Sequence, residues 1–199
     1  MKIIGLTGGI GAGKSTVSEY LKAQDYPVVD ADQISRDLMV PGAPLLSRLE
    51  EAFGPEIILP GRVLDRKGLA RIAFATEEGK DLLNRITHGA INEKILADLR
   101  DLESQGFKLA FLDAPLLFEV GLDRFTHLVW LVDASDEVRI ARVMDRDGLS
   151  REEILDRMAR QMSGEEKRAR ASRILDNSGD LESLHEQIRR LLAEKDILE

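Results

Sequence analysis

A glycine-rich stretch near the start of the chain, from Gly8 to Thr16, decides more about the fold than any other segment. It reads G-G-I-G-A-G-K-S-T and fits the pattern G-x-x-x-x-G-K-[ST]. An apolar run precedes it at 3–6, and apolar residues at helical spacing follow it from Val17 onward. This order of strand, loop and helix is typical of a loop that binds phosphate groups. A glycine-rich turn that binds nothing remains the plain alternative.

The residue types in this loop suit a nucleoside triphosphate. Glycines let the backbone take positive φ and approach a ligand closely, so that loop amides and the start of the next helix face the phosphates. Lys14 would reach the outer phosphates, and the Ser15 hydroxyl would bind Mg²⁺. A dinucleotide loop fits less well, because its pattern needs Gly or Ala where Lys14 stands. The residues expected to hold the nucleotide are Gly8, Gly9, Gly11, Ala12, Gly13, Lys14, Ser15 and Thr16.

Composition narrows the class of protein. The chain has 199 residues, of which 43% are hydrophobic, enough for one good core. A formal net charge of -8 argues against a nucleic-acid or anionic-membrane binder. The absence of cysteine rules out disulfides, thiolate metal sites and cysteine nucleophiles. No signal peptide or membrane span is visible, so we expect a cytoplasmic protein that acts on small molecules without an obligatory protein partner.

Acidic residues follow two of the predicted strands. Asp30 and Asp32 come after the short strand at 27–29, and Asp113 ends the apolar strand at 107–112. Ligands of open α/β sheets bind at the carboxyl ends of strands, so these carboxylates are candidates for the chemistry. One of the first two could instead cap the following helix. After Asp113, a proline and the apolar Leu116 suggest a shaped pocket.

The rest of the chain predicts two insertions into the sheet. Residues 33–105 are mostly helical and carry His88, and we expect an acceptor substrate to bind there. Residues 139–172 are rich in arginine, with Arg139, Arg142 and Arg146 on one helical face. Such arginines can form a lid that neutralises charge on a transferred phosphoryl group. A solvated helix with internal ion pairs would give a similar pattern.

These features predict an α/β fold with a phosphate-binding-loop core. We expect a mostly parallel five-stranded sheet flanked by helices and built from about 1–32, 106–138 and 173–199. The helical acceptor subdomain would span 33–105 and the lid 139–172, all within one kinase domain. A GTPase is disfavoured, because the guanine-binding N-K-x-D is absent. A small-molecule kinase fits best; an ATPase or ATP-binding module acting on a partner is less favoured.

The chain resembles the dephospho-coenzyme A kinases over nearly its whole length. The matching segments are I-G-L-T-G-G-I-G-A-G-K-S-T at 4–16, V-D-A-D at 29–32, L-D-R at 64–66, D-A-P-L-L-F-E at 113–119, R-V-M-D-R-D-G-L-S at 142–150 with Gln161, and I-L-D-N-S-G at 174–179. The resemblance implies phosphorylation of the ribose 3′-hydroxyl of dephospho-CoA by ATP with Mg²⁺, the last step of coenzyme A synthesis. One departure is visible: the family usually has His-Pro where this chain has His88-Gly89, and a glycine would loosen a turn there.

The resemblance also implies roles for single residues. Asp32 would accept the proton of the 3′-hydroxyl, although Asp30 and Asp113 remain alternatives. Arg142, with Arg139 or Arg146 as possible helpers, would stabilise the transferred group. Three further residues, His88, Asp113 and Leu116, would lie at the acceptor or a metal-bound water, and Asn177 would meet the adenine of ATP.

Overall fold

The structure is a computed structural model that describes residues 1–198, so the last residue of the predicted core lies outside the described part. Two compact units make up the chain. One contains residues Met1–Val29 and those from Leu102 onward, and the other contains Asp30–Asp101. No helix in the described part is both long and apolar enough to cross a membrane.

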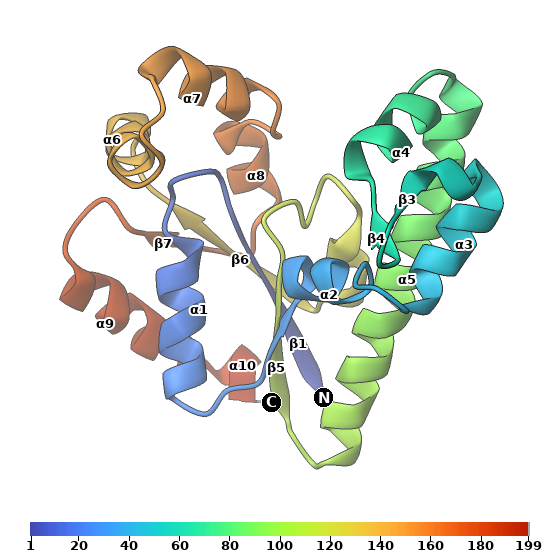
Figure 1. The fold of residues 1–199 in the computed structure, drawn as a ribbon. Coiled ribbons are helices and arrows are strands. Elements are labelled where there is room, and N and C mark those ends of the chain that lie inside the picture. Colours follow the sequence, from blue (N-terminus) through green and yellow to red (C-terminus); the bar gives the residue numbers. More distant parts are fainter. Residues whose placement is uncertain (199) are drawn as a thin grey trace. The chain divides into compact units, whose positions relative to one another are not determined.

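The helices and strands alternate along most of the chain (Figure 1). They are β1 (Lys2–Gly8), α1 (Lys14–Ala23), β2 (Val28–Asp30), α2 (Ala31–Asp37), α3 (Pro44–Phe53), η1 (Pro55–Ile57), β3 (Ile58–Leu59), β4 (Val63–Leu64), α4 (Arg66–Ala73), α5 (Glu77–Ser104), β5 (Leu109–Asp113), η2 (Leu122–Phe125), β6 (Leu128–Asp133), α6 (Asp136–Asp147), α7 (Arg151–Ala159), α8 (Gly164–Arg170), β7 (Arg173–Asp176), α9 (Leu181–Leu192) and α10 (Lys195–Leu198).

The central sheet has the strand order β2-β5-β1-β6-β7. Strand β1 pairs in parallel with β5 and β6, and β6 pairs in parallel with β7. The register sets Leu6 opposite Asp113 and Gly8 opposite Val132, so these strands end at the same edge of the sheet. The predicted α/β fold with a five-stranded sheet is therefore confirmed, and the loop after β1 begins at the edge where such sheets bind ligands.

The two faces of this sheet are covered in different ways. Helices α1 and α9 cover one face (Figure 1). Their apolar residues pack against Leu6, Phe111 and Trp130 of the central strands. On the other face, a Cβ built on Gly5 would lie 2.8 Å from Leu117, in the segment after β5. Helix α8 also contacts β6. The segment after β5 and helix α8 therefore lie close to the functional edge of the sheet.

The unit formed by Asp30–Asp101 has an apolar core of its own, centred on α3, α4 and part of α5. The sequence predicts a mostly helical segment here, and the structure adds two short strands to the helices. These strands form an antiparallel hairpin in which Ile58 pairs with Leu64 and Leu59 with Val63. Each strand has only two residues, so the pairing depends on contacts that no local pattern reveals.

Helix α5 continues without a break from Glu77 to Ser104. The expected turn at His88-Gly89 was therefore wrong, since both residues lie in the middle of this helix. A proline after His88 would disturb such a helix, because proline removes a backbone donor and clashes with the preceding turn. Glycine at this position keeps the helix hydrogen-bonded.

Replacing Gly89 by alanine is expected to raise the free energy of unfolding by about 1 kcal/mol, because glycine is the poorer helix former. A Cβ at Gly89 meets nothing within 4 Å. Gly106, after the end of α5, also has open space but a φ of +92°. Gly106→Ala is therefore the control and should destabilise the protein. Urea unfolding curves of the two variants should shift in opposite directions; shifts of the same sign would contradict the helical conformation of Gly89.

Candidate active site

The loop between β1 and α1 has the backbone of an anion-binding site. Gly11 and Gly13 have φ values of 76° and 88°, which side chains other than glycine rarely adopt. In the described part of the chain, no side chain caps the start of α1 and no acidic residue stands in its first turn. The Thr16 amide donates to the carbonyl of Gly13 at 3.1 Å, and the amides before it in α1 are left for a ligand with negative charge.

Three side chains from distant parts of the chain form hydrogen bonds with the backbone of this loop. Arg139 donates from Nε to the carbonyl of Ile10 at 3.0 Å, and Gln161 accepts from the amide of Ile10 at 3.0 Å. Asn177 donates to the carbonyl of Ala12 at 2.8 Å. Arg139 and Asn177 are buried. The sequence suggests Arg139 as a helper of Arg142 and Asn177 as a contact of adenine. In the structure, the polar groups of both residues contact the loop backbone. A contact of Asn177 with adenine stays a prediction.

Lys14, the first residue of α1, forms an ion pair with Asp113, the last residue of β5. The Asp113 side chain is only 4% exposed, whereas that of Lys14 is 20% exposed. The pairing follows from the sheet, because β1 and β5 are neighbours that end at the same edge. An ammonium group has three donors, so Lys14 can keep Asp113 and still reach a phosphate oxygen.

The three arginines on one face of α6 have different environments. Arg146 is exposed and pairs with Asp147 at 2.7 Å, and this hydrogen bond holds the pKa of the Asp147 carboxyl below its usual value. Arg139 braces the loop. Arg142 has a buried Nη1 without a hydrogen-bond partner among the described residues, and a Cβ built on Gly13 would lie 3.7 Å from it. Among the three, Arg142 is therefore the arginine with a buried and unsatisfied donor near the loop in the described part of the chain.

Asp30 and Asp32 are both at the start of α2, but they have different roles in the helix. Asp30 is the N-cap residue, and its carboxylate accepts from the amide of Gln33 at 2.9 Å. Asp32 lies in the first turn and is exposed. The sequence allows either aspartate to cap α2, and in the structure the N-cap residue is Asp30.

His88 lines a cavity of about 310 Å³ that lies entirely within the Asp30–Asp101 unit. Its lining combines apolar side chains such as Leu69 with polar ones such as Arg66 and Asn84. Leu116, predicted at the acceptor site, lies in the turns after β5 and is 41% exposed. Its role stays a prediction.

The protein oxygens near the loop suit a magnesium ion that is bound mainly by water and by the phosphates of a nucleotide. Among the described residues, there is no group of three or more His, Asp or Glu side chains that could hold a metal ion. Mg²⁺ in nucleotide enzymes usually keeps several waters and takes one or two protein oxygens together with substrate phosphates. Ser15, next to Lys14 in the loop, and the carboxylate of Asp113 are oxygen donors of this kind.

Comparison with known proteins gives one consistent result. The model of the dephospho-CoA kinase family matches residues 2–183. A dephospho-CoA kinase of Corynebacterium glutamicum is 46% identical over 191 residues, which are 96% of each chain. One of Arabidopsis thaliana is 41% identical and covers 98% of this chain and 84% of the relative.

Solved structures agree with this result. The protein TT1252 from Thermus thermophilus has a TM-score of 0.82 and 42% identity, with 98% of this chain and 97% of that one covered. A dephospho-CoA kinase from Campylobacter jejuni has a TM-score of 0.71 and 28% identity, with 96% of both chains covered. Similarity of this extent in sequence and in fold leads to one conclusion: this chain belongs to the dephospho-CoA kinase family.

Proposed function

We propose that this protein transfers the γ-phosphoryl group of ATP to the ribose 3′-hydroxyl of dephospho-CoA, giving CoA and ADP. The family supports the reaction, and relatives named dephospho-CoA kinase match nearly the whole chain. The proposal includes small-molecule substrates only and a cytoplasmic location, which a chain without cysteine suits.

The strongest support for a phosphate site is the buried Nη1 of the Arg142 guanidinium. A buried donor without a partner costs free energy, so an acceptor is expected at that point. Its proximity to Gly13 suits the phosphate chain of a nucleotide bound by the loop amides. Lys14 would hold the β- and γ-phosphates from the other side, and Arg142 would stabilise charge that develops on the transferred group.

The reaction moves one proton and one phosphoryl group. The 3′-oxygen forms a bond to the γ-phosphorus, the bond from that phosphorus to the β,γ-bridging oxygen breaks, and ADP leaves with the electron pair. Asp32 would take the proton of the 3′-hydroxyl. Mg²⁺, with Ser15 as its protein ligand, would neutralise charge on the phosphates. Asp32 is exposed in the first turn of α2, where a substrate hydroxyl can reach its carboxylate, and this supports Asp32 for the proton.

The acceptor would contact the unit formed by Asp30–Asp101. Its cavity offers apolar surface next to the hydrogen-bonding groups of Arg66, Asn84 and His88, a mixture that suits a ligand with both apolar and polar parts. We include Leu116 and Asp113 among the acceptor-binding residues and Asn177 among those that meet ATP.

ADP release in a coupled assay tests this function. Mg-ATP is supplied with dephospho-CoA, shikimate, a nucleoside monophosphate or no acceptor, and the products are identified. We expect release that depends on dephospho-CoA, with CoA as the product. Release with another acceptor would keep a kinase but reject this substrate. Release without an acceptor, or none with any of them, would favour an ATPase or a binding module.

A further inference from the structure

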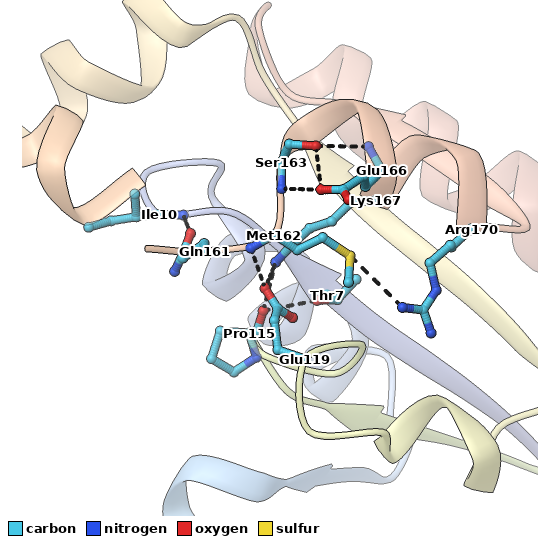
Figure 2. A network of polar contacts seen from close by, with 10 residues as sticks. All are labelled: Thr7, Ile10, Pro115, Glu119, Gln161, Met162, Ser163, Glu166, Lys167 and Arg170. Carbon is cyan, nitrogen blue, oxygen red and sulfur yellow. Dashed lines mark hydrogen bonds and ion pairs between the residues drawn. The ribbon is translucent and has the colours of Figure 1, made fainter. Parts of the chain in front are cut away.

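Lys167 of α8 is a buried cation that the proposed reaction does not use. Its side chain is 1% exposed, which is unusual for lysine because burial of an ammonium is costly unless it is paired. It forms an ion pair with Glu119 at 2.8 Å and donates to the carbonyl of Pro115 at 3.2 Å. Figure 2 shows these contacts between helix α8 and the segment after β5.

The Glu119 carboxylate has a second contact, toward the ATP-binding loop. It accepts from the amide of Met162 at 3.1 Å. The preceding residue, Gln161, accepts from the amide of Ile10 in the loop (Figure 2). Glu119 therefore fixes the short segment that positions Gln161, and Gln161 fixes the loop backbone.

The carbonyl of Pro115 connects Lys167 with strand β1, which ends at the ATP-binding loop. It accepts from Thr7 at 3.1 Å as well as from Lys167. Thr7 lies in β1, one residue before the loop. Pro115 follows Asp113 by two residues, and Asp113 pairs with Lys14. One ammonium thus connects the segments that hold Ile10 and Lys14.

We propose that Glu119 and Lys167 form a positioning pair that keeps the ATP-binding loop in its binding conformation through Gln161. This inference rests on the proposed function only in that ATP is the ligand of the loop. The contacts of the pair are with Pro115 and Met162, which lie outside the loop, so we expect it to act on ATP affinity through the shape of the loop. A loop held in place in advance binds its ligand without an ordering cost.

If the pair only stabilised the fold, the loss of another anchor of α8 would weaken ATP binding by the same amount. Arg170, on the same helix, also anchors α8 to the segment after β5, since it pairs with Asp123 at 2.8 Å and lies 4.4 Å from the ring centre of Phe118. Arg170 also lies 4.0 Å from the sulfur of Met162, a weak contact with that side chain and not with the amide that Glu119 holds. Arg170→Met is therefore a matched control for the loss of a cationic anchor from α8.

The test is a double-mutant cycle on the Kd for Mg-ATP, measured by titration calorimetry on the full chain without acceptor. Lys167→Met and Gln161→Ala should each weaken ATP binding about tenfold, because small displacements of a loop are costly to binding. If Lys167 acts through Gln161, the double variant should also lose about tenfold rather than about a hundredfold. Arg170→Met should keep the wild-type affinity, and Lys167→Arg should recover part of the loss.

Three results would overturn the proposal: an unchanged Kd in Lys167→Met, multiplicative effects in the double variant, or an equal loss in Arg170→Met. If Lys167→Met does not fold, the paired replacement Lys167→Met with Glu119→Leu takes its place in the cycle under the same criteria, since it leaves no unpaired buried charge and removes the contact with Met162. The proposed acceptor is judged separately. Wild-type protein that binds ATP but shows no dephospho-CoA-dependent turnover would reject the acceptor and leave this cycle valid.

Discussion

Replacing Asp32 by asparagine is expected to lower kcat by about a thousandfold, within the range that general-base catalysis contributes. Asparagine has nearly the same shape as aspartate but cannot take the proton of the attacking hydroxyl. Because Asp32 belongs to α2 and not to the ATP-binding loop, the Kd for ATP should stay within about twofold of the wild-type value. Steady-state kinetics with dephospho-CoA, together with direct ATP titration, would separate the two effects.

Asp30 supplies the matched control for this prediction. Its carboxylate caps α2 through the amide of Gln33, and asparagine is as good an N-cap as aspartate. Asp30→Asn therefore removes a charge two residues from Asp32 while the helix keeps its cap. A small change in kcat is expected. If Asp30→Asn lost as much turnover as Asp32→Asn, or if Asp32→Asn retained full turnover, Asp32 would not be the base.

The parts of the site that could be predicted from the sequence are those with local signals. The glycine pattern at 8–16 gives its own flanking strand and helix, and Asp113 was found because it ends an apolar strand. The helix cap that the sequence offers at Asp30 or Asp32 is also a local pattern, and Asp30 forms it in the structure. In each case the residues that interact, or the element that positions them, lie within a few positions of one another.

The contacts that hold the loop could not be predicted in this way. Arg139, Gln161 and Asn177 reach it from 129 to 165 positions along the chain, and sequence patterns carry no register for such distances. Glu119 lay within a recognised motif, but only the fold reveals that its partner is Lys167. Arg139 illustrates this, because it shares a helical face with Arg142 but is buried and donates to the loop backbone in the structure.

Replacing Lys14 by methionine is expected to lower kcat/KM by about a thousandfold, because a fixed positive charge at the phosphates is lost. Unlike Asp32→Asn, this variant should also bind ATP more weakly. A second effect is expected on stability. Asp113 would remain almost fully buried without its partner, and removal of one member of such a pair destabilises a protein by roughly 3 kcal/mol when both are buried. Since Lys14 is partly exposed, a smaller loss is expected here.

The double variant Lys14→Met with Asp113→Asn separates these two effects. Without the buried charge at Asp113, the free energy of unfolding should return toward the wild-type value, as measured by urea unfolding. Turnover should not return, because the double variant still lacks the ammonium at the phosphates. Recovery of both would mean that Lys14 serves mainly to neutralise Asp113. Recovery of neither would mean that Asp113 has a further partner in the folded protein. Asp113→Asn alone is therefore the reference for turnover. A double variant that is stable but turns over far more slowly than Asp113→Asn assigns Lys14 to the reaction and its pairing with Asp113 to the fold.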